Sequence, residues 1–246
     1  MASLYLTTPA ELAEGVAAGR VRLTGDEARH AAQVSRVRVG EHISVGDGAG
    51  TIASGEVEQV APGEVLVRVE VVRTDDAPRP ALWLAQALAK GDRDELAIQA
   101  ATELGVSGVI PWAAERSVSR WSGPKVEKGR TRWETIVREA SKQAIRARVP
   151  EVAPLAATRD LAAHSSEHAI ALVLDPTAEI GIGEVEVAHL DRITLVVGPE
   201  GGISPAELAS LEAAGARRVR LGAEILRTST AGPAALAVLN ARLGRW

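Results

Sequence analysis

From residue 81 to residue 246, short apolar runs alternate with segments patterned as helices, and this alternation limits the chain to few folds. The apolar runs lie at residues 81–89, 106–112, 168–175, 192–198 and 217–222. The helical segments lie at residues 91–104, about 126–147, 204–215 and 230–243. Strands that alternate with helices usually form a parallel sheet that is covered by the helices. We therefore predict an α/β domain over residues 81–246.

The N-terminal part has a different pattern and is predicted to be a small β-rich domain over residues 1–73. Two β-rich runs flank Asp47-Gly48, a pair typical of hairpin turns, and residues 64–72 form a third strand with alternating apolar side chains. Before them, Thr24 and Glu27 fit a capping box, which predicts a short helix that extends through residue 38. The polar stretch at residues 74–80, which contains two prolines, is predicted to be a linker.

Several classes of chemistry lack the residues that they need. The chain has no cysteine, which excludes disulfides, thiolate metal sites and cysteine nucleophiles. Residues 164–168 match the H-x-x-E-H pattern of some zinc peptidases, but an apolar strand follows immediately, so we predict no metal site. The N-terminus lacks the pattern of a signal peptide, and no apolar run is long enough to span a bilayer. We therefore expect a cytoplasmic protein with no membrane partner.

Positive charge is concentrated between residues 116 and 148, where ten Lys and Arg residues are accompanied by three Glu in a chain of net charge −4. Trp121 and Trp133 lie among them. One interpretation is the solvated face of a helix. The other is a surface that binds a polyanion such as RNA. The charge pattern by itself favours neither.

Three late apolar runs end in residues that suit a ligand site. They end at Leu174-Asp175-Pro176, at Gly198-Pro199-Glu200-Gly201-Gly202 and at Leu221-Gly222, which Ile225-Leu226-Arg227-Thr228 follows. Ligands of open α/β sheets bind beyond the carboxyl ends of the strands, so we expect these segments to share one pocket. Glycines let a backbone approach a ligand closely, but an acidic loop without lysine is unsuited to phosphate. A cationic nucleoside without phosphate, such as S-adenosylmethionine, suits the loop better.

The chain also resembles a known family in the order and spacing of its motifs. KGDRDELAIQAATELGV (90–106), EASKQAIRARVPEV (139–152), VVGPEGGIS (196–204) and LGAEILRTSTA (221–231) resemble the motifs of the RsmE-type 16S ribosomal RNA uracil-N3 methyltransferases. Residues 29–50 resemble the N-terminal RNA-binding segment of that family. Three positions depart from the family pattern: Glu224 replaces a frequent basic residue, Ser229 a frequent Glu, and Ile145 a common Gly.

The resemblance implies an enzyme of the SPOUT class. The fold that it implies is a PUA-like β-barrel domain followed by an α/β domain with a C-terminal trefoil knot within roughly residues 169–243. The implied activity is methylation of uracil N3 in 16S ribosomal RNA, naked or in the assembled small subunit, by a homodimer that uses S-adenosylmethionine. The alternative is a non-catalytic RNA-binding protein that retains the SPOUT fold. The departures from the family pattern at Glu224 and Ser229 support this alternative. A dehydrogenase-like enzyme is disfavoured because the dinucleotide-binding fingerprint is missing.

The resemblance and the strand ends together give a set of expected site residues. Arg227 is the candidate for stabilising the uracil anion, and Glu200 is a candidate either for accepting the N3 proton or for bonding loop amides. The residues expected to bind S-adenosylmethionine are Leu174, Val197, Gly198, Pro199, Glu200, Gly201, Gly202, Leu221, Gly222, Ile225, Leu226, Arg227 and Thr230. The residues expected to bind RNA are Arg29, Arg36, Arg38, Arg116, Arg130, Arg132, Lys142 and Arg146.

Overall fold

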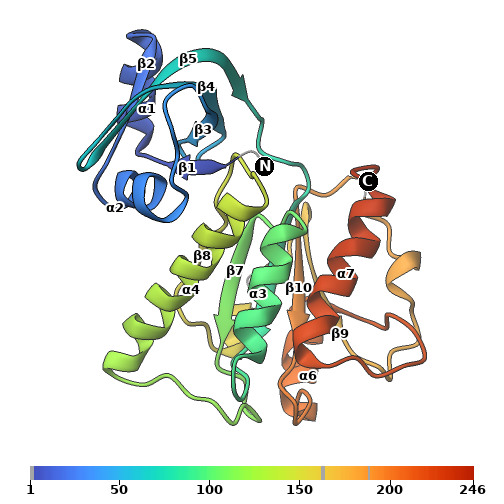
Figure 1. Cartoon of the computed structure of the whole chain (residues 1–246). Helices are drawn as coiled ribbons and strands as arrows, with labels where there is room; N and C mark the ends of the chain where they lie inside the picture. Colours follow the sequence, from blue (N-terminus) through green and yellow to red (C-terminus); the bar gives the residue numbers. More distant parts are fainter. Residues whose placement is uncertain (1–2, 162–163, 188) are drawn as a thin grey trace. The chain divides into compact units, whose positions relative to one another are not determined.

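The computed structural model describes residues 3–161, 164–187 and 189–246, and within them the chain forms two compact units, each with its own β-sheet (Figure 1). The N-terminal unit comprises the described residues up to Ala77 together with Ser141–Val149. The C-terminal unit comprises Pro78–Ala140 and the described residues from Pro150 onward. The predicted boundaries at residues 73 and 81 did not anticipate that residues 141–149 belong with the N-terminal unit.

The N-terminal unit is built on a five-stranded sheet with the strand order β1-β3-β4-β5-β2. Its strands are β1 (Leu4–Leu6), β2 (Arg20–Thr24), β3 (His42–Gly46), β4 (Thr51–Ala61) and β5 (Glu64–Thr74). β1 pairs with β3 in parallel, and the other neighbouring strands are antiparallel. The predicted hairpin about Asp47-Gly48 and the predicted third strand are confirmed.

The helices of this unit differ from the prediction. Helix α1 (Pro9–Ala17) was not predicted, although Thr8 and Glu11 form a complete capping box at its start. Helix α2 (Gly25–Arg29) follows Thr24, but the Thr24 side chain makes no capping hydrogen bond, so the capping box predicted there is wrong. Gly25 has a left-handed φ of 59°, which departs from a regular first helical turn. The helix continues only as one π-helical turn, η1 (His30–Val34), and does not reach residue 38.

Residues 141–149 complete a small apolar cluster of the N-terminal unit. Ala147 packs there with the buried side chains of β1 and with Ile52 of β4, and Ile145 and Val149 pack against the same cluster. Ile145 has a left-handed φ of 53°, which is rare for a β-branched residue. Glycine adopts this conformation without strain, so a glycine would fit this position better than Ile145 does.

The C-terminal unit contains a six-stranded sheet with the order β11-β9-β10-β6-β7-β8, in which all neighbouring strands are parallel. The prediction of a parallel sheet is therefore confirmed. Its strands are β6 (Ala81–Ala87), β7 (Gly108–Trp112), β8 (Glu151–Val152), β9 (Ala169–Leu174), β10 (Arg192–Val197) and β11 (Arg217–Val219). The trefoil knot predicted within residues 169–243 stays a prediction.

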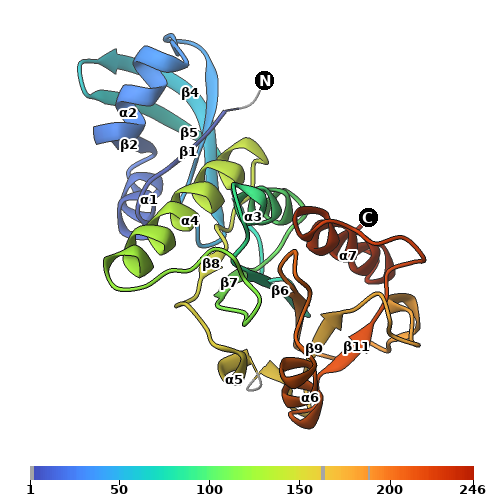
Figure 2. The ribbon, with the colours of Figure 1, turned by 90° about the horizontal axis from the view of Figure 1, so that it is seen from below.

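Helices cover both faces of this sheet, which buries its apolar strands (Figure 2). On one face lie α3 (Arg93–Glu103), the part of α4 (Pro124–Gln143) that belongs to this unit, and α7 (Thr228–Arg242). On the other face lie α5 (Thr158–Leu161) and α6 (Pro205–Ala213). A short 3-10 turn, η3 (Ile182–Glu184), follows β9. Ser204 and Glu207 form a complete capping box at the start of α6, in agreement with the helix predicted from residue 204.

No helix in the described part of the chain combines the length and the apolar character that crossing a bilayer requires.

Candidate functional site

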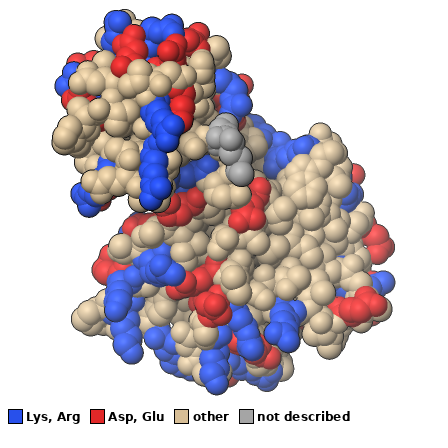
Figure 3. All heavy atoms as spheres, viewed as in Figure 1, with Lys and Arg blue, Asp and Glu red and all other residues tan. Residues whose placement is uncertain are grey.

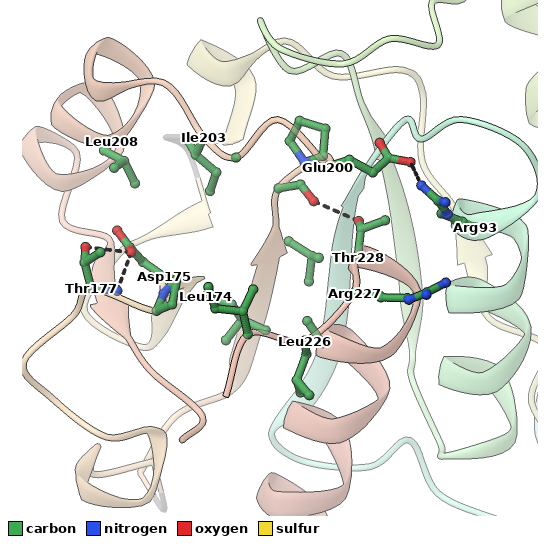
Figure 4. Close-up of a pocket in the computed structure, with 17 residues that line it drawn as sticks. Arg93, Leu174, Asp175, Thr177, Glu200, Ile203, Leu208, Leu226, Arg227 and Thr228 are labelled. Carbon is green, nitrogen blue, oxygen red and sulfur yellow. Dashed lines mark hydrogen bonds and ion pairs between the residues drawn. The ribbon is translucent and has the colours of Figure 1, made fainter. Parts of the chain in front are cut away.

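A pocket of about 550 Å³ opens at the carboxyl ends of β9 and β10, next to the segment that leads into α7 (Figure 4). The three segments that were predicted to share a pocket all contribute to its wall. Its lining residues are Arg93, Leu174, Asp175, Pro176, Thr177, Val197, Gly198, Pro199, Glu200, Gly202, Ile203, Leu208, Ile225, Leu226, Arg227, Thr228 and Ala231. Because the neighbouring strands are parallel, the loops that follow them meet at the same edge of the sheet.

The structure brings most of the predicted donor-binding residues into this wall. The nine that line it are Leu174, Val197, Gly198, Pro199, Glu200, Gly202, Ile225, Leu226 and Arg227. Leu221 and Gly222 line a second cavity of about 70 Å³. It shares with the main pocket Leu174, Asp175, Pro176, Ile225, Leu226 and Ala231. Gly201 and Thr230 lie outside the wall of either cavity.

Several wall residues were not among the predicted site residues. Asp175, Pro176 and Thr228 belong to the strand-end segments that were expected to share a pocket, so the sequence already pointed to them. Ile203 and Leu208 are apolar residues that follow the glycine-rich loop. Arg93 lies more than 100 residues before that loop, so only its place in the KGDRDEL motif could have drawn attention to it.

Asp175 follows β9 and is held in place by hydrogen bonds. Its carboxylate accepts hydrogen bonds from the backbone and the hydroxyl of Thr177, both at 2.8 Å, and from Arg218 Nε at 2.9 Å. Burial raises the pKa of the Asp175 carboxyl, but these hydrogen bonds and the Arg218 charge lower it by more, so the pKa lies below its ordinary value. Asp175 is therefore ionised at neutral pH.

Glu200 ties the glycine-rich loop after β10 to the segment after β6. Its Oε1 accepts hydrogen bonds from Arg93 Nη1 at 2.8 Å and from the backbone N–H of Lys90 at 3.1 Å. Burial raises the pKa of the Glu200 carboxyl, but hydrogen bonds from backbone amides and from Arg93 lower it by more, and the net direction is downward. A carboxylate with a lowered pKa is a weak base, which favours the loop-bonding role over proton acceptance.

Arg227 immediately precedes α7 and its side chain is exposed to solvent. Its backbone carbonyl accepts hydrogen bonds from the N–H groups of Thr230 and Ala231, at 2.8 and 3.0 Å, so the backbone fixes its position. Figure 4 shows the side chains of Arg93 and Arg227 on one side of the pocket and those of Asp175 and Thr177 on the opposite side. The positive charge of the pocket wall is thus gathered at one side.

The glycines of the loop after β10 serve different purposes. At Gly198, a Cβ atom would lie 2.6 Å from Ile203 Cγ1, which leaves room only for glycine. Gly202 lines the pocket with a left-handed φ of 72°, where L side chains are strained. Gly201 faces a different neighbour, because its Cβ would lie 3.2 Å from Arg116 Cβ, and Arg116 Nη1 donates to the Gly201 carbonyl at 3.3 Å. The absence of a side chain at Gly201 therefore makes room for Arg116 and not for a ligand in the pocket.

In the N-terminal unit, the predicted RNA-binding residues Arg36 and Arg38 lie in the loop after η1, and both are exposed. Arg29 forms an ion pair with Asp26 at 2.7 Å, in which both side chains remain largely exposed. Exposed ion pairs of this kind contribute little to stability and leave the guanidinium accessible. These three arginines are thus available for contact with a polyanion.

On α4, the predicted RNA-binding arginines are paired with acidic side chains. Arg130 contacts Glu134 at 3.2 Å, and Arg132 contacts Glu95 of α3 at 2.8 Å. Figure 3 shows Lys and Arg side chains intermixed with Asp and Glu over the α4 part of the surface. This mixture of charges favours a solvated helix face, rather than an RNA-binding surface, for the middle of the basic segment at residues 116–148.

Lys142 and Arg146, the last two predicted RNA-binding residues, belong to the N-terminal unit and are drawn into its interior. The Lys142 side chain is only 8% exposed, and its Nζ lies 3.2 Å from Glu27 Oε1 and 3.4 Å from His30 Nδ1. Burial lowers the pKa of the Arg146 guanidinium to about 10. The charge of Lys142 is already paired with the partly buried carboxylate of Glu27, which argues against a contact with phosphate, and an RNA-binding role for Lys142 stays a prediction.

Across the residues that the structure describes, no cluster of His, Asp and Glu side chains has an arrangement that suits a metal ion. His164, the first residue of the H-x-x-E-H match, lies with its Nδ1 3.4 Å from Thr194 Oγ1.

The chain is similar to known RNA methyltransferases along most of its length. The family described as "RNA methyltransferase domain" matches residues 76–240, and the family described as "RNA methyltransferase PUA domain" matches residues 23–70. The ribosomal RNA small subunit methyltransferase E of Mycobacterium bovis is 44% identical over 228 residues, which are 90% of this chain and 86% of that protein. The protein of the same name from Bacillus subtilis is 31% identical over 226 residues, which are 89% of this chain and 88% of that protein.

The fold agrees with these matches. A crystal structure of ribosomal RNA small subunit methyltransferase E from Neisseria gonorrhoeae, bound to S-adenosylmethionine, has a TM-score of 0.87 to this chain at 28% identity and covers 98% of both chains. The predicted α/β fold with an N-terminal PUA-like domain is confirmed. On the identity and coverage of its relatives and on the pocket that the family motifs share, the chain belongs to the RsmE-type family of RNA methyltransferases.

Proposed function

We propose that the protein transfers a methyl group from S-adenosylmethionine to N3 of a uridine in 16S ribosomal RNA. One observation carries the proposal: the motifs that follow β9 and β10 and precede α7 meet in a single pocket. The Neisseria relative, which has the same fold, was crystallised with S-adenosylmethionine, and the curated relatives are ribosomal RNA small subunit methyltransferases.

The residues of the pocket fit this donor. Its volume of about 550 Å³ is within the usual range for small-molecule sites, and its aliphatic side chains suit the faces of an adenine ring. The aliphatic wall residues are Leu174, Val197, Ile203, Leu208, Ile225 and Leu226. The ionised carboxylates of Asp175 and Glu200 lie in the same wall and are compatible with a cationic ligand.

When bound, S-adenosylmethionine supplies a methyl group on a positively charged sulfur, which can be transferred directly without a covalent enzyme intermediate. The residues of the chain position the reactants and stabilise charge. Arg227 and Arg93 line the same side of the pocket, and we assign to Arg227 the stabilisation of the negative charge that develops on the uracil. Glu200, which already bonds Arg93 and Lys90, holds the two loops together rather than accepting the proton.

The RNA partner is supported by the PUA-like domain and by the exposed arginines of the N-terminal unit. Phosphate contacts from such residues set the position of the RNA, whereas the target base is recognised in the pocket. Because the proposed substrate is ribosomal RNA, free or assembled in the small subunit, we place the action of the protein in the cytoplasm.

Two assays test the proposed function together. Calorimetry is expected to show one S-adenosylmethionine bound per chain. Incubation with 16S ribosomal RNA, or with small subunits that lack the modification, is expected to give N3-methyluridine at one position, detected by mass spectrometry of the nucleosides. RNA binding without donor binding and without a methylated nucleoside would contradict the proposal and support the non-catalytic alternative.

We propose further that the active form is a homodimer. Large apolar side chains remain exposed in the C-terminal unit at and beside α7: Ile225 is 81% exposed, Trp246 is 67% exposed, and Val238 is 37% exposed. Contact with a second copy of the chain would remove this apolar surface from water. Sedimentation at micromolar concentration is expected to give about twice the chain mass of 25.7 kDa, and a monomer at that concentration would refute the dimer.

A further inference from the structure

We propose that Gln86 is a positioning residue for the methyl donor and that it acts through the hydroxyl of Thr228. This inference rests on the proposed function of the pocket. Gln86 lies at the carboxyl end of β6, is completely buried and does not line the pocket. Thr228, the first residue of α7, does line it and is 7% exposed.

The hydrogen bonds around Gln86 have only one consistent direction. The side-chain nitrogen lies 3.1 Å from the carbonyl oxygen of Ala87, which can only accept, so this atom is the amide nitrogen. The same nitrogen donates to Thr228 Oγ1 at 2.8 Å. The Thr228 hydroxyl keeps its own hydrogen, which it donates to the Gly198 carbonyl at 2.8 Å (Figure 4). Gln86 therefore fixes the direction of the hydroxyl toward Gly198.

This chain of hydrogen bonds joins three segments that are distant in the sequence. Gln86 pairs with Val197 across β6 and β10, and Gly198 begins the glycine-rich loop directly after that pair. Thr228 follows Arg227, the residue assigned to the uracil anion. One hydroxyl thus links the start of the donor loop to the segment that carries Arg227, and both segments belong to the pocket wall.

A buried glutamine at position 86 is unfavourable if the side chain only fills space. Its Oε1 is buried and has no hydrogen-bond partner among the described residues. A buried polar atom without a partner destabilises the folded state, and a leucine of similar size would avoid that penalty. Only the nitrogen side of the amide is used, and it is used to orient Thr228.

The test compares substitutions of Thr228 in the full-length protein by calorimetry with S-adenosylmethionine. Thr228→Val keeps the shape and removes the hydroxyl, so the Kd for the donor is expected to rise about tenfold, the factor that corresponds to roughly 1.4 kcal/mol. Thr228→Ser restores the hydroxyl and is expected to recover most of the affinity. In methyl-transfer assays, Thr228→Val is expected to raise KM for the donor more than it lowers kcat.

Thr102→Val provides the matched control. Thr102 is also completely buried in the C-terminal unit and also donates to a backbone carbonyl, that of Ile98 at 2.7 Å, but it lies on α3 and outside the pocket wall. This variant is expected to melt at a lower temperature with its donor Kd unchanged. If Thr228→Val behaves in the same way, with lower stability and an unchanged Kd, Thr228 is merely structural and the inference is overturned.

Gln86→Leu supplies a second, independent test and decides the question if Thr228→Val does not fold. The leucine leaves the Thr228 hydroxyl free to rotate, so a rise of about threefold in the donor Kd is expected, and the double variant should bind no more weakly than Thr228→Val alone, because both changes act through one hydroxyl. An unchanged Kd in folded Gln86→Leu would refute the role of Gln86. Failure of the wild-type protein to bind S-adenosylmethionine would instead refute the proposed function.

Discussion

Replacement of Arg227 by alanine is expected to lower kcat for methyl transfer by about 10²–10³-fold, the usual effect of removing one donor that stabilises a developing anion. The side chain lines the pocket and is exposed, so a base that enters the pocket can reach it. The backbone of Arg227 is held by Thr230 and Ala231, so the loop should keep its shape when the side chain is removed. The RNA affinity is therefore expected to stay within about threefold of the wild type, since the loss of the uracil contact falls on the transition state.

The control for this variant is Arg227→Lys, which keeps the charge and loses the planar fork of donors. An intermediate rate is expected, because the ammonium still attracts a uracil anion but with less specific geometry. Single-turnover assays with saturating donor and RNA separate the chemical step from binding. A kcat for Arg227→Ala within threefold of the wild type would show that the uracil anion is stabilised elsewhere in the pocket.

Simultaneous replacement of Arg36 and Arg38 by glutamate is expected to weaken RNA binding at least about tenfold and to reduce the slope of log K against log salt by roughly two, about one for each lost phosphate contact. Both side chains are exposed, whereas Arg132 is paired with Glu95 and Lys142 is buried beside Glu27. The N-terminal loop is therefore the better place to test the basic surface. Donor binding should not change, because both residues lie outside the pocket wall.

A matched control makes the same change of charge in the C-terminal unit. Arg159 and Arg217 are both exposed, and neither was predicted to bind RNA. Their double replacement by glutamate is expected to leave the salt slope nearly unchanged. Salt-titrated binding of 16S ribosomal RNA measures both pairs. If the two double variants lose affinity equally, the effect is one of net charge, and Arg36 and Arg38 have no specific contact.

The parallel sheet and its pocket were predictable because their signals are local. Each strand of the C-terminal unit is a short apolar run, and strands that are parallel deliver their following loops to one edge. Most donor-site predictions therefore fell on residues of the pocket wall. Arg93 and Gln86 escaped prediction because their roles depend on partners more than 100 residues away, Glu200 and Thr228. No periodicity in the sequence reports such a pair.

The helices of the N-terminal unit show how one local pattern can mislead and another can be overlooked. Thr8-Pro9-Ala10-Glu11 has the same order of hydroxyl, proline, alanine and glutamate as residues 204–207, and both sequences start helices with capping boxes. The Thr24 and Glu27 pair has the same spacing, but Thr24 is still the last residue of β2 and Gly25 then turns with a positive φ. Because Thr24 belongs to strand β2, its side chain does not cap helix α2.

Residues 141–149 belong to the N-terminal unit, and this determines which fragments and chimeras of the protein can fold. The backbone of that segment is bonded to the N-terminal sheet region, since Gly50 N donates to Ala147 O at 3.0 Å and Val149 N donates to Gly48 O at 2.9 Å. A fragment that stops at Ala77 would therefore leave the apolar cluster around Ala147 incomplete. The N-terminal unit is built from two separate stretches of the chain, so an exchange of this unit between relatives has to transfer both stretches together.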